Sequence, residues 1–198
     1  MKHYVTGDVE VFAYQRTKEG NVQCGDDYFY LCTEDYFVCV LADGLGSGES
    51  AYESATAVVA IVKQYHNEDV ETMMERCNAE LAEKRGAAVA IFKVYFSKRE
   101  FVYSCVGNIR FFLYSSSGKL TYPLPVTGYL SGRPQSFRTQ NYAYEQYSTF
   151  LIYSDGFHFN GLKNLLNPIR SLSSIAEDIK NRPFPFADDA TFIIGKLY

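Results

Sequence analysis

Acidic residues stand at the ends of four predicted strands, and their side chains are the ones most suited to chemistry. Asp43-Gly44 and Asp155-Gly156 each follow an apolar run, whereas Asp26-Asp27 and Asp188-Asp189 each precede one. If these strands are antiparallel in a sheet, the ends of one pair and the starts of the other fall on the same edge. The sequence therefore predicts that four acidic sites converge at one rim.

Carboxylates gathered this closely repel one another unless a cation neutralises them. Hard oxygen ligands without His or Cys indicate Mg²⁺, Mn²⁺ or Ca²⁺ rather than zinc. The histidines do not have metal-ligand spacing; they are His3, His66 and His158. A single Asp-Gly pair is more often a plain hairpin turn, so the metal prediction depends on the four sites together.

A glycine-rich turn, Gly44-Leu45-Gly46-Ser47-Gly48, follows Asp43 and leads into a predicted helix. Its glycines allow the backbone to approach an ion or a phosphate, and a helix N-terminus favours an anion. The turn lacks the lysine of a nucleotide-binding P-loop. Nucleotide binding is therefore not supported.

The composition limits the class of protein. The chain has 198 residues, of which 47% are hydrophobic and 16% aromatic, so we expect one domain spanning residues 1–198 with a large β component. A net charge of −4 argues against nucleic-acid binding and disfavours a two-metal nuclease.

Targeting and cysteine signals indicate a cytoplasmic protein. The first residues do not form a secretory signal, and the longest apolar run, 36–42, is too short to span a membrane, so no membrane partner is expected. The five cysteines include no Cys-x-x-Cys pair, which predicts reduced thiols in the core.

The elements that position the acids follow from hydrophobic periodicity. Helices are predicted over 49–66, 69–84, 160–166 and 171–180, and a loop over 122–138. A weak edge strand is expected at 140–147. The other predicted strands are 9–15, 28–32, 36–42, 87–96, 101–106, 109–114, 149–154 and 190–197. The segment 28–42 is a predicted hairpin, and the three strands from 87 to 114 are predicted to be antiparallel. Two early helices and two late ones around eight or more strands suggest sheets covered by helical layers.

Five short motifs, taken in chain order, resemble those of the metal-dependent PP2C protein phosphatases. They are Gly25-Asp26, Asp43-Gly44-Leu45-Gly46-Ser47-Gly48, Val106-Gly107-Asn108, Ser154-Asp155-Gly156 and Asp188-Asp189-Ala190-Thr191. Further stretches, including Cys77-Asn78 and Lys84-Arg85-Gly86, are most similar to the short bacterial branch of that family. The resemblance implies an α+β fold, a four-layer α-β-β-α sandwich of two antiparallel sheets flanked by helix pairs.

The same resemblance implies two Mn²⁺ or Mg²⁺ ions. Asp43 would bridge both ions and the Gly44 carbonyl would bind one. Asp155 and Asp188 would hold the other, and Asp26 would complete the site directly or through water. Asp27, Asp189 and Asn108 would lie just behind these ligands. Catalysis would then depend on Asp43, Asp155 and Asp188 through a metal-activated water, without a phosphoenzyme.

The implied substrates are phosphoserine and phosphothreonine in proteins. For the short bacterial branch, these would be scaffold proteins of the stressosome, which the enzyme would dephosphorylate as negative feedback on the general stress response. The loop 122–138 is either a partner-recognition segment or a rigid connector.

Several positions depart from the family pattern. Leu45 replaces a histidine proposed to protonate the leaving group, so water or another group must do so. Asn108 and Phe159 replace aspartates that help hold a third ion. No arginine precedes Asp26 to bind phosphate; Arg110 and Arg133 are alternatives. These departures leave open a second hypothesis, a catalytically weak binding module with the same fold.

Overall fold

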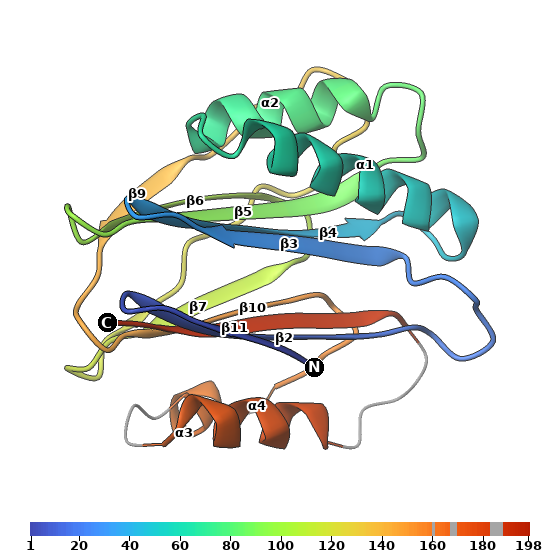
Figure 1. Cartoon of the computed structure of the whole chain (residues 1–198). Helices are drawn as coiled ribbons and strands as arrows, with labels where there is room; N and C mark the ends of the chain where they lie inside the picture. Colours follow the sequence, from blue (N-terminus) through green and yellow to red (C-terminus); the bar gives the residue numbers. More distant parts are fainter. Residues whose placement is uncertain (160, 167–169, 183–187) are drawn as a thin grey trace.

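Two antiparallel β-sheets face each other and are covered on their outer faces by helices, as Figure 1 shows. The structure is a computed structural model that describes residues 1–159, 161–166, 170–182 and 188–198. The pair α1 and α2 covers one sheet, and α3 and α4 cover the other (Figure 1). The predicted four-layer sandwich is therefore confirmed.

The first sheet has the order β3-β4-β5-β6-β9 and contains the predicted hairpin. Its strands are β3 (Asp26–Cys32), β4 (Tyr36–Gly44), β5 (Ala87–Tyr95), β6 (Glu100–Val106) and β9 (Gln140–Ala143). The short β9 lies at the sheet edge, as its weak alternation predicts. Both faces of β4 and β5 are buried, which explains their continuous apolar sequences.

The second sheet has the order β1-β2-β11-β10-β7-β8. Its strands are β1 (Lys2–Val5), β2 (Val9–Arg16), β11 (Ala190–Leu197), β10 (Thr149–Tyr153), β7 (Arg110–Tyr114) and β8 (Leu120–Thr121). The short edge strands β1 and β8 were not predicted, because neither has an apolar alternation. The expectation that β7 follows β6 in one sheet is wrong: β7 pairs with β10 instead. Gly107, at φ 124°, allows the sharp change of direction by which the chain passes from β6 in the first sheet to β7 in the second.

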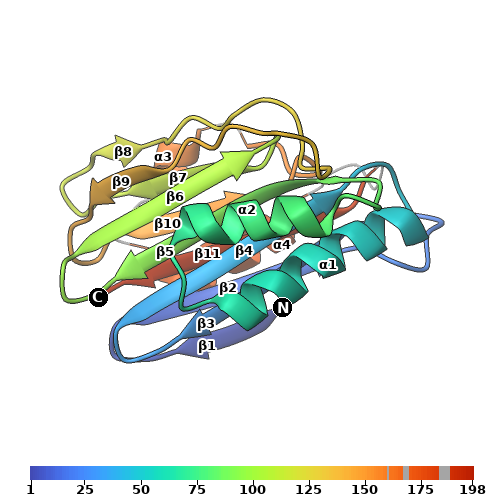
Figure 2. The ribbon, with the colours of Figure 1, turned by 90° about the horizontal axis from the view of Figure 1, so that it is seen from above.

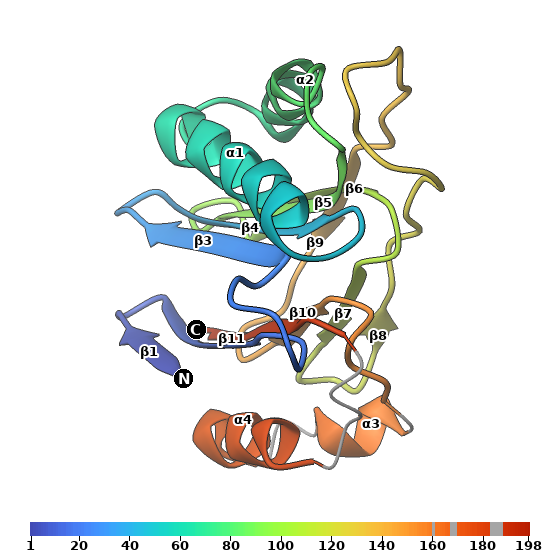
Figure 3. The ribbon, with the colours of Figure 1, turned by 90° about the vertical axis from the view of Figure 1, so that its right-hand side faces the viewer.

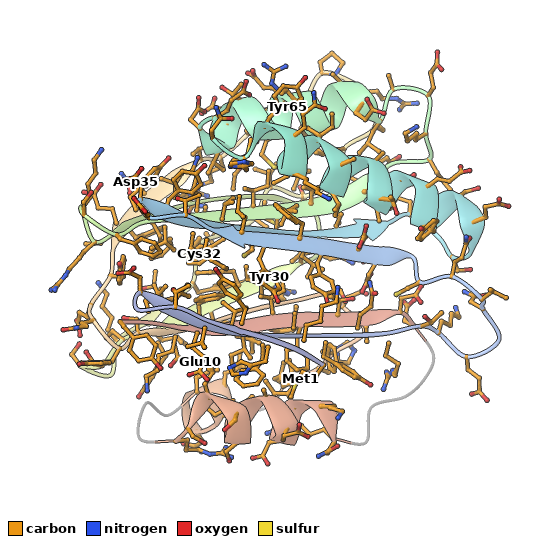
Figure 4. The ribbon with its side chains drawn as sticks, in the orientation of Figure 1. Met1, Glu10, Tyr30, Cys32, Asp35 and Tyr65 are labelled. Atoms are coloured by element: carbon orange, nitrogen blue, oxygen red, sulfur yellow. The ribbon has the colours of Figure 1, made fainter. Side chains whose placement is uncertain are left out.

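Aromatic side chains fill the space between the sheets. Phe92 of β5 contacts Phe111 and Phe150 from the other sheet, with ring centroids 4.9 and 4.8 Å apart. Tyr30 and Cys32 also lie in this layer (Figure 4). Aromatic pairs of this kind stabilise a core beyond their buried area, so these contacts help to hold the two sheets together.

The helices are α1 (Glu49–Tyr65), α2 (Val70–Glu80), α3 (Leu162–Leu165) and α4 (Leu172–Lys180). Seen from above in Figure 2, α1 and α2 lie across the first sheet. The α2 helix ends at Glu80, before the predicted Lys84, because the chain turns at residues 81–83. Of the predicted helix 160–166, Asn160 lies outside the described residues. No helix in the described ranges is long and apolar enough to cross a membrane.

The 122–138 loop rests against α2. The side chain of Asn78 accepts hydrogen bonds from the amides of Ser131 and Gly132, both at 3.1 Å, and donates one to the Arg133 carbonyl at 2.8 Å. These three bonds fix the middle of the loop, as expected for a connector. Whether the loop also recognises a partner stays a prediction.

Candidate metal centre

Asp26 and Asp43 form the inner part of the site. The two residues are Cα partners in the β3–β4 ladder, and Tyr28, Tyr30 and Leu41 on the same strand faces belong to the core between the sheets. Asp26 is only 2% exposed. The site thus begins with two carboxylates side by side at the end of the inter-sheet layer.

Ser154, from the second sheet's side, holds the Asp26 carboxylate in place. Its Oγ donates a hydrogen bond to Asp26 Oδ2 at 2.7 Å and accepts one from the Thr191 amide at 2.9 Å. Both bonds are buried, so losing the hydroxyl would leave polar groups unpaired. Ser154 therefore joins the two sheets at the site.

Two glycines allow the backbone to pack closely around the carboxylates. A Cβ on Gly44 would lie 2.0 Å from the Ala51 carbonyl oxygen of α1, and one on Gly156 would lie 2.1 Å from the Asp189 carbonyl oxygen. Only glycine permits approaches this close. Gly44 brings α1 against the Asp43 turn, and Gly156 brings Asp155 beside residues 188–189.

A cavity of about 280 Å³ lies where these segments meet. Three of the predicted ligand carboxylates line it, those of Asp43, Asp155 and Asp188. The remaining lining residues are Gly44, Leu45, Gly46, Ala88 and Asn108. Within the described ranges, no three His, Cys, Asp or Glu side chains already form a compact metal-binding cluster; the carboxylates are spread around the cavity.

The acids reach this cavity from two facing sheets rather than from one. Asp43 belongs to the first sheet, whereas Asp155 follows β10 and Asp188 precedes β11 in the second. The expectation of a single sheet edge was wrong, because matching strand ends do not reveal which strands are hydrogen-bonded. Since the sandwich aligns the ends of its sheets, the acids still meet.

Asn108 and Asp189 support the backbone and the carboxylates around the cavity. The Asn108 side-chain amide donates to Asp155 Oδ2 at 2.7 Å. Asp189 is 4% exposed, and its two oxygens accept hydrogen bonds from the amides of Lys18 (2.8 Å) and Gly25 (2.9 Å). Asp189 therefore anchors the segment that leads into Asp26.

The position of Asp27 corrects one prediction. Its neighbours on the same strand face, Phe29 and Leu31, pack in the core beneath the helices, so Asp27 lies on the opposite face from Asp26. Its Oδ1 accepts a hydrogen bond from the Tyr28 amide at 2.8 Å. The alternation of side chains along a strand is enough to predict that Asp26 and Asp27 lie on opposite faces.

Carboxylates of the site have raised pKa values. Burial, followed by the charges of Asp26, Asp155 and Asp188, raises the pKa of Asp43 to about 9. Burial raises the pKa of Asp26 to about 7, although the hydrogen bond from Ser154 opposes the shift. Burial and the nearby Asp188 also raise the pKa of Asp155. Such a set of oxygen ligands suits a hard dication, which would offset both the burial and the repulsion.

Arg85 is a cation beside the site whose position the sequence did not predict. Its guanidinium carbon lies 3.0 Å from the point that a Cβ on Gly46 would occupy, so the group lies against the cavity-lining turn. Arg85 belongs to the Lys84-Arg85-Gly86 stretch, but nothing in its spacing relates it to Gly46. Among the earlier alternatives, Arg110 lines an adjoining groove, and Arg133 is exposed.

The α-β-β-α sandwich, with an acidic cavity at the aligned ends of its two sheets, defines the chain as a PP2C-type phosphatase. It belongs to the family described as Stage II sporulation protein E (SpoIIE), whose model matches residues 33–197.

The relatives agree with this placement. The chain is 42% identical over 189 residues to phosphoserine phosphatase RsbX of Bacillus subtilis (strain 168), covering 96% of this chain and 95% of RsbX. A crystal structure of RsbX in complex with magnesium matches with a TM-score of 0.95 at 40% identity, over 100% of this chain and 99% of the other. A structure from work on the bacterial stressosome matches with a TM-score of 0.85 at 27% identity, over 94% and 98%.

Proposed function

We propose that this protein is a metal-dependent phosphatase that removes phosphate from phosphoserine and phosphothreonine in proteins. The observation that carries the proposal is the meeting of Asp43, Asp155 and Asp188 around one cavity. The raised pKa of Asp43, caused by burial and by neighbouring carboxylates, supports a site that accepts cations. The similarity to RsbX, a named phosphoserine phosphatase, supports the reaction class.

Two Mn²⁺ or Mg²⁺ ions would bind between the sheets. Asp43 would bridge them with the Gly44 carbonyl beside it, while Asp155 and Asp188 would hold one ion from the second sheet. The RsbX complex with magnesium supports this choice of metal. Asp26 would contribute directly or through water, with its carboxylate fixed by Ser154.

Bound dications lower the pKa of water and neutralise phosphate charge. The chain's own residues supply the arrangement around them. Asn108 holds Asp155 through its 2.7 Å hydrogen bond, and this kind of support fixes a ligand's orientation. Arg85, beside Gly46, is placed to offset the charge of a phosphate entering the cavity. Leu45 lines the cavity but has no acidic proton to donate, so the leaving oxygen takes a proton from water or another group.

A third ion is not part of the proposal. Asn108 and Phe159 occupy the positions where related phosphatases have additional aspartates. Asn108 is hydrogen-bonded to Asp155, and the Phe159 ring packs edge-on against Tyr153 at 4.7 Å. Neither residue offers a carboxylate there.

Scaffold proteins of the stressosome are the substrates we propose, with the chain acting in the cytoplasm as one domain. This part of the proposal is supported by the similarity to RsbX and to a chain from a stressosome study. Removal of phosphate from such a scaffold would act as negative feedback on the stress response.

Phosphate release from a phosphoserine peptide, measured with and without Mn²⁺, tests the reaction. Asp43→Asn should reduce turnover at least about 10³-fold, because it removes the bridging charge. Asp35→Asn is the matched control, since Asp35 is exposed at the opposite end of the same hairpin (Figure 4). Full activity of Asp43→Asn would refute the assignment. Absence of metal-dependent turnover in the wild type would instead favour the binding-module hypothesis that Leu45, Asn108 and Phe159 suggest.

A further inference from the structure

A second cavity, of about 500 Å³, adjoins the candidate metal centre. It lies on the outer face of β7 and β10, the side of that sheet on which α3 lies (Figure 3). Asn108 and Asp155 line both this cavity and the acidic one. A group held in one cavity is therefore next to a group held in the other.

Aromatic rings form the walls of this cavity, which we call the aromatic groove. The Phe112 ring is stacked on Tyr122 with centroids 4.7 Å apart and faces Tyr153 at 6.2 Å. Phe159 packs edge-on against Tyr153. Phe112, Tyr122 and Phe159 are only partly buried, so their rings offer apolar surface to a ligand.

Arg110 gives the groove a fixed polar group. Its Nη1 donates a hydrogen bond to the Tyr122 hydroxyl at 2.5 Å. The guanidinium has five N–H donors, so others remain for a ligand, and Arg110 is exposed. A polypeptide presents both apolar side chains and backbone carbonyl acceptors. The groove matches that combination better than it matches a purely apolar molecule.

We propose that the aromatic groove binds an apolar side chain of the substrate polypeptide, one or two residues from the phosphoserine. This inference rests on the proposed phosphatase function, because the phosphate in the acidic cavity fixes which part of the chain reaches the groove. An extended chain advances about 3.4 Å per residue. The aromatic groove shares Asn108 and Asp155 with the acidic cavity, so only residues next to the phosphoserine are close enough to reach the groove. Arg110 would bond to a backbone carbonyl of the same segment.

Phosphoserine peptides that differ only at the two positions on each side of the phosphoserine test the proposal. Each flanking position is either Leu or Gly, and kcat/KM is measured with Mn²⁺. For the wild-type protein, Leu at one of these positions should raise kcat/KM about tenfold or more over Gly, the discrimination typical of an apolar pocket. The Gly peptide serves as the reference for every variant.

Two groove variants, Phe159→Ala and Tyr122→Ala, should each reduce that preference to less than about threefold. Cleavage of the Gly peptide by Phe159→Ala should stay close to that of the wild type. Tyr122→Ala also removes the hydrogen-bond partner of Arg110, so this variant is compared with the wild type only by its ratio of Leu-peptide to Gly-peptide kcat/KM. Tyr4→Ala is the control, because Tyr4 is 37% exposed on the edge strand β1, at the opposite edge of the sheet from β7.

Equal cleavage of Leu and Gly peptides by the wild type would overturn the groove proposal, even if both variants failed to fold. A preference that persists in folded variants would also overturn it. Either result leaves the phosphatase function intact, whereas a wild type that cleaves no peptide would contradict the function itself.

Discussion

Asp26 and Asp43 are directly opposite each other in the β3–β4 ladder, with both side chains on the face between the two sheets. Like charges opposite each other on neighbouring strands destabilise a sheet. Here the same register places Asp43 at the cavity that Asp155 and Asp188 also line, with the buried Asp26 beside it. The register that builds the candidate site therefore also creates the repulsion that a dication would relieve.

Replacing Asp43 should stabilise the metal-free protein. Its pKa is raised from 3.8 to about 9 in the folded chain, so its contribution to stability is greatest in acid and is lost as the pH rises through that range. At pH 8, Asp43→Asn should raise the unfolding midpoint of the metal-free protein by at least about 2–4 °C, the shift expected for about 1 kcal/mol. Thermal unfolding scans in the presence of a chelator, which keeps the protein metal-free, measure this shift in the midpoint.

The same variant should lose the stabilisation that metal gives. Adding Mn²⁺ should raise the midpoint of the wild type and of Asp35→Asn, because a ligand that binds only the folded state stabilises it. A midpoint of Asp43→Asn that rises equally with Mn²⁺ would contradict the role assigned to this carboxylate.

Metal binding should release protons. In the metal-free protein at pH 7.5, Asp43, with a pKa of about 9, is largely protonated, whereas Asp26, with a pKa of about 7, is mostly ionised. The Mn²⁺ affinity should therefore rise by up to about tenfold per pH unit between pH 7 and 9. Calorimetry in buffers with different ionisation enthalpies counts the protons. An affinity that does not change with pH would contradict the protonated state of Asp43.

Gly156→Ala should disturb the site from the backbone. The added Cβ would lie 2.1 Å from the Asp189 carbonyl oxygen, so the 155–156 and 188–189 segments must move apart. We expect a loss of stability of about 1–3 kcal/mol together with weaker Mn²⁺ binding. Gly7→Ala is the control, since nothing lies within 4 Å of its added Cβ. Unchanged metal affinity in Gly156→Ala would show that this close approach does not position the carboxylates.

Arg85→Ala should weaken phosphate binding without weakening metal binding. Because its guanidinium lies against Gly46 at the cavity, we expect about a tenfold increase in KM for a phosphopeptide and in the inhibition constant of inorganic phosphate. Lys84→Ala is the control: Lys84 pairs with Glu80 at 3.8 Å on the preceding turn. Equal effects of the two variants would indicate a general loss of charge instead of a specific contact.

The layered fold could be predicted from the sequence because its main strands and helices have strong periodicity. The pairing of β7 with β10 could not, since an apolar run does not say which sheet it joins. The acids could be predicted from their positions at strand ends. The alternation of side chains along a strand would also have placed Asp27 on the opposite face from Asp26. The roles of Arg85 and Ser154 could not be predicted, because each contacts a residue far away in the chain. Arg85 lies against Gly46, and Ser154 is hydrogen-bonded to Asp26.

A calorimetric titration of the metal-free protein with Mn²⁺ at pH 8 tests the central claim most directly. We predict two ions per wild-type chain and the loss of at least one of them in Asp43→Asn. No measurable uptake by the wild type at millimolar Mn²⁺, or the same two ions in Asp43→Asn, would contradict a metal centre built from the carboxylates of both sheets.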